Sequence, residues 1–222
     1  MAVILTDLDG CIGYLNTLYN ISSTPPTSGE EDYLVWTSLF NIAKSLWEKE
    51  GLWKELVVDL ANAADGDKTT TTATSYDLPS LFRFPMTGIV WLGTGTDKTD
   101  YPVIDVTQKQ LYENNSDNWC YFLNGKLYFN PNLSITAAQT INYTYYKYAT
   151  KLTTGSDLME MSDPMFAVYF ALSELKKDEG DTAAGAIATQ KLAAMKTQNA
   201  SPAFFQTDNL LNQTEAGFGT EE

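Results

Sequence analysis

Apolar residues recur with two different periods along this chain. Near both ends they fall every three or four positions, which predicts helices over residues 7–20, 28–50, 164–179 and 182–198. Between these segments, residues 76–152 carry short apolar and aromatic runs separated by turn residues, as is typical of β-strands. This order predicts an α+β protein, in which the N- and C-terminal helices form an antiparallel bundle with an inserted small antiparallel β-barrel or sandwich.

The Thr-, Asp- and Gly-rich residues 61–75 form the clearest internal boundary. We therefore expect a helical domain from residues 1–60 and 156–200, with an inserted β domain from residues 61–155. Residues 201–222 show no sustained period and are expected to form an extended C-terminal tail.

The strongest local signal is a β-hairpin in residues 119–129. Two apolar-aromatic runs flank Asn124-Gly125, and both turn residues tolerate the positive φ that a two-residue type I′ turn requires. The resulting register predicts an apolar face inside the β domain, made of Cys120, Phe122, Leu127 and Phe129. Tyr121 and Tyr128 belong to the other face, and we expect them on a surface that a neighbouring subunit could cover. Residues 140–152 are expected to form a third strand.

Capping signals indicate where the first two helices begin and end. Thr6 and Asp9 have the spacing of a capping box, and so do Ser28 and Glu31. Gly51 is expected to end the second helix in the left-handed conformation. This helix carries an apolar stripe that we expect in the core, made of Trp36, Leu39, Phe40, Ala43, Leu46 and Trp47.

The sequence Asp7-Leu8-Asp9-Gly10 resembles the first motif of haloacid dehalogenase-type phosphohydrolases. In that family the first aspartate is the nucleophile, the second is a general acid and base, and magnesium binds between them. Such a site requires a buried parallel strand before Asp7 and a loop after it. Here the apolar residues continue at helical spacing, so we interpret both aspartates as first-turn acids that complement the helix dipole.

The amino-acid composition narrows the possible classes of function further. The chain of 222 residues is 44% hydrophobic, which suits a packed core, and its net charge of −14 argues against a surface that grips nucleic acid. Because the chain has no histidine, it lacks the commonest general base and metal ligand. We therefore expect no catalytic residue, no cofactor and no metal. Cys11 and Cys120 are expected to be reduced, and the lack of a long apolar run or secretory signal predicts a soluble protein without membrane contact.

Five motifs occur in a recognisable order between residues 28 and 198. Residues 30–53 form an acidic helix start with a Trp-rich end, and residues 76–79 read Tyr-x-Leu-Pro. A hairpin of the form YFLNGKLYFNP follows, then the strand pattern Thr-Ile-x-Tyr-x-Tyr-Tyr-Lys at residues 140–147. Residues 157–164 lead into the last helices with Asp-x-Met-Glu-Met-x-x-Pro. Together these motifs resemble the head-to-tail connector (adaptor) proteins of tailed bacteriophages.

The resemblance implies a structural protein of the virion neck, arranged as a ring of twelve copies below the portal. It implies the portal protein, tail or other neck proteins and further copies of this chain as partners, assembly in the host cytoplasm, and no catalysis. DNA would pass through the lumen without specific binding, and an acidic lumen would repel it and let it slide.

Other interpretations stay open. Another neck ring, such as a stopper or tail-completion protein, has the same kind of composition. A carbohydrate-binding module would explain the Tyr- and Trp-rich β region, because sugars stack on aromatic rings, and the Asp7 motif keeps a magnesium-dependent phosphatase open. Apolar pairs in the tail favour docking on the portal or a neighbouring subunit, with a solvated end as the alternative; these are Phe204, Phe205, Leu210 and Leu211.

Overall fold

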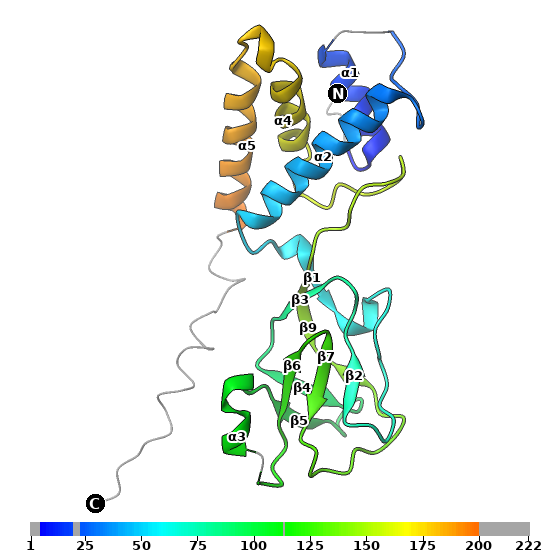
Figure 1. Ribbon diagram of the computed structural model, residues 1–222, viewed down its shortest axis with the longest axis vertical. Coiled ribbons are helices and arrows are strands. Elements are labelled where there is room, and N and C mark those ends of the chain that lie inside the picture. Colours follow the sequence, from blue (N-terminus) through cyan, green and yellow to red (C-terminus); the bar gives the residue numbers. More distant parts are fainter. Residues whose placement is uncertain (1–4, 20–22, 113, 200–222) are drawn as a thin grey trace, which may run out of the picture. The chain divides into compact units, whose positions relative to one another are not determined.

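The computed structural model describes residues 5–19, 23–112 and 114–199 (Figure 1). Within them the protein is a mixed α+β structure with five α-helices and three small antiparallel sheets. The chain forms two compact units. We call residues 5–55 and 149–199 the helical unit and residues 56–148 the β unit.

The unit boundaries differ from the expected ones by a few residues. Residues 56–60 belong to the β unit because Val57–Asp59 (β1) pairs with Thr144–Lys147 (β9). Residues 149–155 belong to the helical unit because they bind the second helix, as described below.

The four predicted helices of the helical unit are confirmed: α1 Leu8–Tyr19, α2 Glu31–Lys49, α4 Met165–Leu175 and α5 Ala183–Asn199. Helix α4 contacts each of the other three, and its apolar side chains, such as Phe166 and Val168, are buried. Small residues let α5 approach α4 closely, since a Cβ at Gly185 would crowd the hydroxyl of Ser173. The most deeply buried large side chains of α1 and α2 are Leu8, Ile12, Leu15, Trp36, Phe40 and Trp47.

The ends of α1 and α2 differ from the expected caps. The Asp7 carboxylate accepts a hydrogen bond of 2.9 Å from the Gly10 N–H, so Asp7 itself caps α1. Before α2, the Thr27 N–H donates to the Glu30 carboxylate over 2.7 Å, and the Glu30 N–H donates to the Thr27 carbonyl. This reciprocal pair lies one residue before the predicted box. The prediction for Gly51 was wrong, because α2 ends at Lys49, the capping residue Glu50 is right-handed and Gly51 does not have a positive φ.

The segment that returns from the β unit, residues 149–160, binds the polar side of α2. Asn41 holds Leu152 by two hydrogen bonds: its amide donates to the Leu152 carbonyl over 3.0 Å and its oxygen accepts the Leu152 N–H over 2.9 Å. About two turns after Asn41 along the helix, the Glu48 carboxylate accepts a hydrogen bond from the Ala149 N–H over 3.0 Å. These bonds satisfy backbone groups of Ala149 and Leu152, which belong to no strand.

A buried ion pair completes this contact. Lys44 on α2 lies 2.6 Å from the Glu160 carboxylate, with side-chain exposures of only 3% and 12%. The Lys44 ammonium also donates to the Leu158 carbonyl over 3.1 Å, and the Glu160 carboxylate accepts the N–H and hydroxyl of Thr150. Glu160 has φ of 59°, a left-handed conformation that is rare for a residue with a side chain. A charged pair out of water requires such extra hydrogen bonds.

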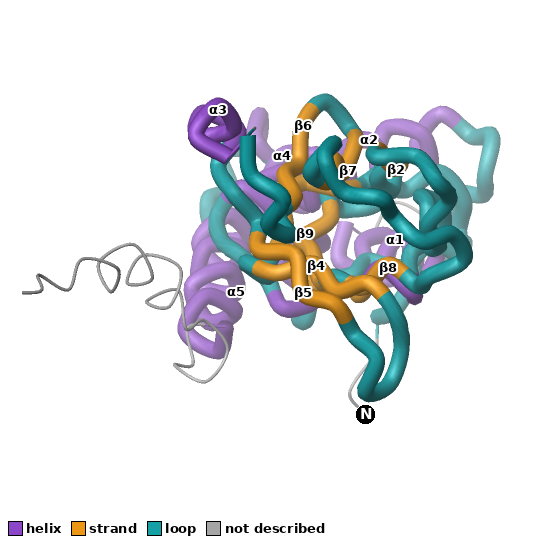
Figure 2. The backbone as a smooth tube through the Cα atoms, turned by 90° about the horizontal axis from the view of Figure 1, so that it is seen from below, coloured by secondary structure: helices purple, strands orange, loops and turns teal. Residues whose placement is uncertain are grey.

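The β unit contains nine short strands in the described residues (Figure 2). One sheet has the order β1-β9-β3, a second β2-β7-β6 and a third β5-β4-β8. None of the sheets is closed into a barrel, so the expected barrel is wrong. Besides β1 and β9, the strands are β2 Ser75–Asp77, β3 Phe82–Pro85, β4 Ile89–Leu92, β5 Thr99–Pro102, β6 Cys120–Leu123, β7 Lys126–Phe129 and β8 Ile141–Asn142. The unit also contains one short helix, α3 Lys109–Tyr112.

The hairpin prediction is confirmed in register and in turn type. Cys120 faces Phe129 and Leu123 faces Lys126, and the turn residues Asn124 and Gly125 have φ of 49° and 74°. Three residues of the predicted apolar face are buried in the core of the β unit, and Phe122 packs against that core while half-buried. The core also contains Leu60, Tyr76, Val90, Leu92, Tyr101, Ile135, Ile141, Tyr143 and Tyr145.

The predicted third strand was wrong in its extent. Residues 140–152 contain two strands, β8 and β9, which pair in the two other sheets. The third strand beside the hairpin is β2, whose Tyr76 faces Leu127. A break at Tyr143 lets successive parts of one extended segment join different sheets, and this tyrosine points its ring into the shared core.

Replacing Lys44 by alanine is expected to lower the free energy of unfolding of the helical unit by about 3 kcal/mol, because it leaves the Glu160 carboxylate in a mostly buried site without its cation. Urea unfolding followed by the helical circular dichroism signal measures this. Lys49→Ala, at an exposed position of the same helix, is the matched control and should change stability by less than about 0.5 kcal/mol. Equal effects of the two substitutions would contradict the structural role of the pair.

Candidate protein contact surfaces

The two aspartates of the first motif have structural partners. Asp7 caps α1, and Asp9 accepts a hydrogen bond of 2.9 Å from the Tyr33 hydroxyl on α2. Burial, followed by the hydrogen bond and charge of Asp9, raises the pKa of Tyr33 to about 12, so this tyrosine stays a neutral donor. Among the described residues, no group of three or more His, Cys, Asp or Glu side chains could hold a metal ion. The motif therefore serves here to begin α1 and to join it to α2.

The start of α1 is also held by the return segment. The Leu8 N–H donates to the Asp157 carbonyl over 3.0 Å, and the Asp9 N–H donates to the Gly155 carbonyl over 2.9 Å. A Cβ at Gly155 would collide with the Asp9 carboxylate, so this position requires glycine or a shift of Asp9. The contact is close because backbone pairs directly with backbone.

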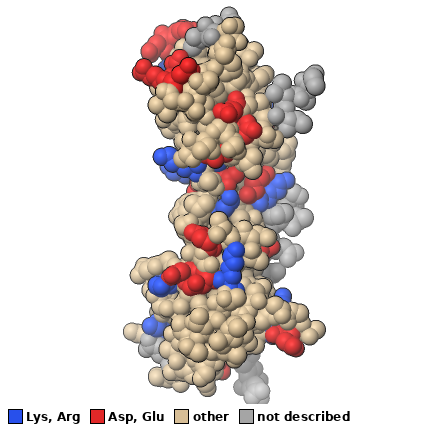
Figure 3. Space-filling view, turned by 90° about the vertical axis from the view of Figure 1, so that its right-hand side faces the viewer, with Lys and Arg blue, Asp and Glu red and all other residues tan. Residues whose placement is uncertain are grey.

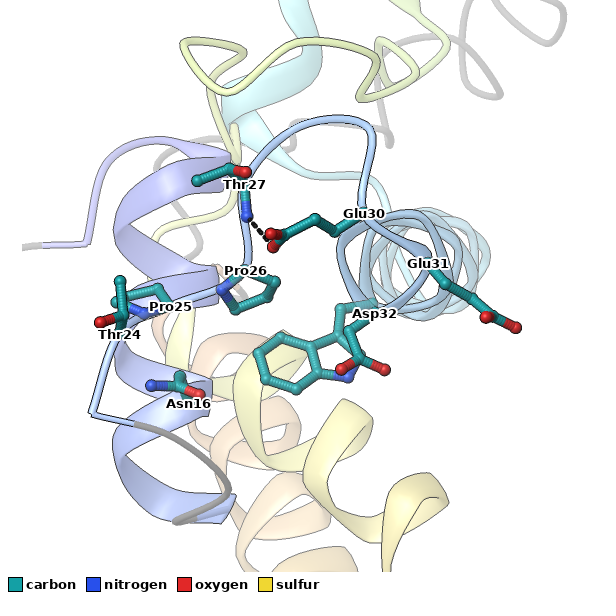
Figure 4. Close-up of a pocket in the computed structure, with 9 residues that line it drawn as sticks. Asn16, Thr24, Pro25, Pro26, Thr27, Glu30, Glu31 and Asp32 are labelled. Carbon is teal, nitrogen blue, oxygen red and sulfur yellow. Dashed lines mark hydrogen bonds between the residues drawn. The ribbon is translucent and has the colours of Figure 1, made fainter.

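Two adjoining hollows open beside α1 and the start of α2. One of about 450 Å³ is lined by Asn16, Thr24, Pro25, Pro26, Thr27, Glu30, Glu31, Asp32 and Trp36 (Figure 4). The other, of about 520 Å³, shares the Thr-Pro-Pro-Thr segment and includes Asp9 and Tyr33. In Figure 4 the Glu30 side chain turns back to Thr27, while Glu31 points away from the hollow. At this hollow Glu30 is thus engaged in capping and Glu31 is directed away from it.

The hairpin tyrosines are less exposed than expected. Tyr121 and Tyr128 stack with their ring centroids 5.0 Å apart and their planes at 8°. Tyr128 is half-buried, but Tyr121 is only 6% exposed, because the Trp119 ring stacks beside it and the Lys109 ammonium lies 5.6 Å above its ring. The expectation that Tyr121 lies on a coverable surface was therefore wrong. A contact role for Tyr128 stays a prediction.

Arg83 and its neighbours form an aromatic hollow on the β unit. Phe82 stacks on Phe122 at 5.2 Å, and the Arg83 guanidinium lies 5.5 Å from the Phe84 ring and 5.8 Å from the Tyr148 ring. A hollow of about 470 Å³ is lined by Phe82, Arg83, Phe84 and Phe122 together with the tip of the hairpin. Its lining also includes the polar residues Ser80 and Asn124.

Helix α2 exposes a second apolar face that the sequence analysis did not identify. Three large side chains on it are 40–50% exposed: Val35, Ile42 and Leu46. Leu46 was expected in the buried stripe and is instead at the surface, and Leu39 is half-buried. The buried face is made by Tyr33, Trp36, Phe40, Ala43, Lys44 and Trp47. The signal was present in the sequence, because α2 carries leucine, valine or isoleucine on both sides.

On the face shown in Figure 3, acidic and basic side chains form small separate groups divided by wide uncharged areas. No described helix is both long and apolar enough to cross a membrane. The predicted contact residues Phe204, Phe205, Leu210 and Leu211 lie outside the described residues.

None of the family models or curated proteins compared with this sequence matches it.

Acid is expected to weaken the contact between the return segment and α1 through Asp157. The pKa of its carboxyl lies below the ordinary value because it accepts the Thr154 N–H, at 2.8 Å, and the Thr153 N–H, at 2.6 Å, with the Thr154 hydroxyl adding a third bond. A depressed folded pKa contributes stability that is complete above the unfolded value of about 4 and is lost as the pH falls toward the lower folded pKa.

Asp157→Asn is therefore expected to lower the urea midpoint at neutral pH and to flatten its decline between about pH 5 and pH 2. Glu31→Gln, which removes an exposed acid from the first turn of α2, controls for the loss of one negative charge. If wild type and Asp157→Asn lose stability in parallel as the pH falls, the assigned role of this carboxylate is wrong.

Proposed function

We propose that this protein is a structural component of a bacteriophage neck, a head-to-tail connector that forms a ring between portal and tail. The observation that carries the proposal is the second apolar face of α2, with side chains such as Ile42 half exposed on a helix whose other face is fully buried. Exposed apolar surface of this extent is typical of protein contact sites. In this proposal the helices of the helical unit form an antiparallel bundle and the β unit a small sandwich, and catalysis has no part.

The order of elements supports the same role. The helical unit is assembled from both ends of the chain, and the β unit is inserted between them, as in the order of motifs that resembles connectors. The motif at residues 157–164 contains two residues with structural roles in this chain. Asp157 accepts a hydrogen bond from the Thr154 N–H, and Glu160 forms the buried ion pair with Lys44. Such an insertion allows one unit to contact neighbouring copies while the other contacts a different partner.

The charge suits a conduit for DNA. The acidic excess lies mainly outside residues 56–148, in the segments that form the helical unit and in the tail. Acidic side chains on a lumen wall would repel the phosphate backbone and keep DNA free to slide. A ring whose lumen is basic and whose acids lie on the outer wall would refute this part of the proposal.

Mixing the chain with the portal protein of the same virus is expected to give one species of discrete mass, consistent with twelve copies bound to the portal. Native mass spectrometry of the chain alone, the portal alone and the mixture measures this. A portal from an unrelated virus is the control and should bind no ring. A chain that remains monomeric with and without its own portal contradicts the connector function, whereas a ring that binds a tail component but no portal favours a stopper or tail-completion protein.

We also propose that the tail docks through Phe204 and Phe205 on the portal or on a neighbouring copy. Deletion of residues 203–222 is then expected to weaken binding of the ring to the portal, because aromatic anchors dominate interface energies. Replacing only the two phenylalanines by serine in the full chain should reproduce most of the loss. If the ring still bound the portal at wild-type strength after the deletion, the tail would not contribute to this contact and would be a solvated end.

A further inference from the structure

The hairpin turn holds the one asparagine of the sequence that is followed by glycine, Asn124. An asparagine in this position can lose its side-chain amide without an enzyme. The backbone nitrogen of the next residue attacks the side-chain carbonyl carbon, its proton passes to the departing amide group, and ammonia leaves as a succinimide ring closes. Glycine favours the attack because it has no side chain to shield its nitrogen. Water then adds to either carbonyl of the ring and leaves aspartate or isoaspartate.

Both reacting groups of this turn are open to solvent. Asn124 and Gly125 are exposed, and within the described residues neither the Asn124 amide nor the Gly125 N–H forms a hydrogen bond. Apart from the chain neighbours of Gly125, no atom lies within 4 Å of the position that a Cβ would occupy there. The nitrogen that would attack and the amide that would leave are therefore not restrained by other parts of the fold.

The asparagine that precedes the small residue Ser116 is held in place. The Asn115 side-chain oxygen accepts the indole N–H of the buried Trp119 over 3.0 Å. Its amide nitrogen donates to the Asp117 carboxylate over 2.9 Å. Because both ends of this amide have partners, Asn115 must break two hydrogen bonds before it can react.

Two aspartates also precede glycine and could form the same ring with loss of water, but the fold restrains both. In the Asp9-Gly10 pair the Gly10 N–H, which would attack, donates to Asp7 over 2.9 Å. The Asp65 carboxylate accepts the Ser80 N–H over 3.1 Å. Hydrogen bonds from Ser80 hold the pKa of Asp65 below its ordinary value, which keeps it ionised and a poor target for a nucleophile.

We propose that Asn124 is a site of spontaneous deamidation in the folded protein, that it reacts before every other described asparagine, and that its isoaspartyl product disrupts the hairpin turn. The proposal does not depend on the function proposed above. In a type I′ turn the rotation about the Cα–C bond of the first turn residue differs from the one that the succinimide requires. The reaction therefore needs a local opening of the turn, and exposed loop tips open at low free energy.

Isoaspartate at this position would change the backbone itself, because it adds a carbon to the main chain between Asn124 and Gly125. The two turn residues have φ of 49° and 74°, which match the turn to the twist of its strands. The turn closes the pair of Leu123 and Lys126, and the Gly125 carbonyl accepts the Leu78 N–H over 2.9 Å. A lengthened turn loses this fit at the end of the β2-β7-β6 sheet.

The reaction would also change the charge of the aromatic hollow on the β unit. Asn124 and Gly125 line this hollow together with Arg83, the only arginine of the sequence. Arg83 is the one charged side chain of the lining. Either product of deamidation adds a carboxylate to it, so the modification alters a surface hollow as well as the turn.

The test follows deamidation in the full-length protein at mildly alkaline pH. One sample stays folded and a parallel sample is unfolded in urea, and peptide mapping by mass spectrometry measures conversion at each asparagine over time. Asn124 is expected to convert first in the folded sample, at a rate no more than roughly a hundredfold below that of the unfolded chain, because only the turn must open. Folding should slow Asn115 by a larger factor than Asn124.

Two outcomes overturn the site. If Asn124 stays intact in the folded protein while the unfolded chain converts, the turn protects it and the inference is wrong. Earlier conversion of another described asparagine would also contradict it. Asn124→Gly is the control for the assignment, because Gly-Gly suits the same turn and carries no amide. This variant should gain no negative charge at the turn when it is aged in the same way.

The structural consequence is tested by comparison with Asn124→Asp. This variant has the charge of the deamidated protein and keeps a normal backbone, and Asp-Gly also suits a type I′ turn. The aged fraction that carries the added charge is isolated by ion exchange and unfolded in urea, with tyrosine and tryptophan fluorescence as the signal. Its midpoint is expected to lie below that of Asn124→Asp, which should unfold like the wild type. Equal midpoints of the aged fraction and Asn124→Asp would refute the disruption of the turn.

Discussion

The helical unit depends on the binding of the return segment to the polar side of α2. The chain leaves this unit at residue 55 and comes back at residue 149, so its two halves are joined through space and not along the backbone. Asn41, Lys44 and Glu48 occupy one side of α2 and bind residues 149–160 by directed hydrogen bonds and a buried ion pair. Directed bonds fix the register of an irregular segment, which apolar contacts alone would leave free to slide.

The same segment continues to the start of α1, where Gly155 and Asp157 pair with the backbone of the first turn. Three parts of the chain that are distant in sequence therefore meet at one irregular segment. The β unit can be inserted here because the positions of its ends are set by the helical unit's own contacts. Its core, which includes Tyr143 and Phe129, is complete in itself. Separate cores let each unit keep its structure while it contacts a different neighbour.

The sequence predicted features that local chemistry decides. Asn124-Gly125 fixed the hairpin register because a type I′ turn leaves little choice, and the helical periods located α1, α2, α4 and α5. Features that depend on distant partners were missed. Tyr121 is buried by Trp119 and Lys109, and residues 140–152 divide between sheets whose other strands come from elsewhere in the chain. The burial of Lys44 could not be foreseen, because a lysine in a helical pattern normally marks the solvent side.

The error at Leu46 is the most informative one for function. A helix with apolar residues on two sides has two possible core faces, and periodicity cannot decide which of them the rest of the chain covers. Here the face with Trp36 and Trp47 packs inside, because the aromatic side chains bury the most area, and the face with Ile42 is left to solvent. An acidic chain can keep such a face exposed because its net charge of −14 opposes non-specific association.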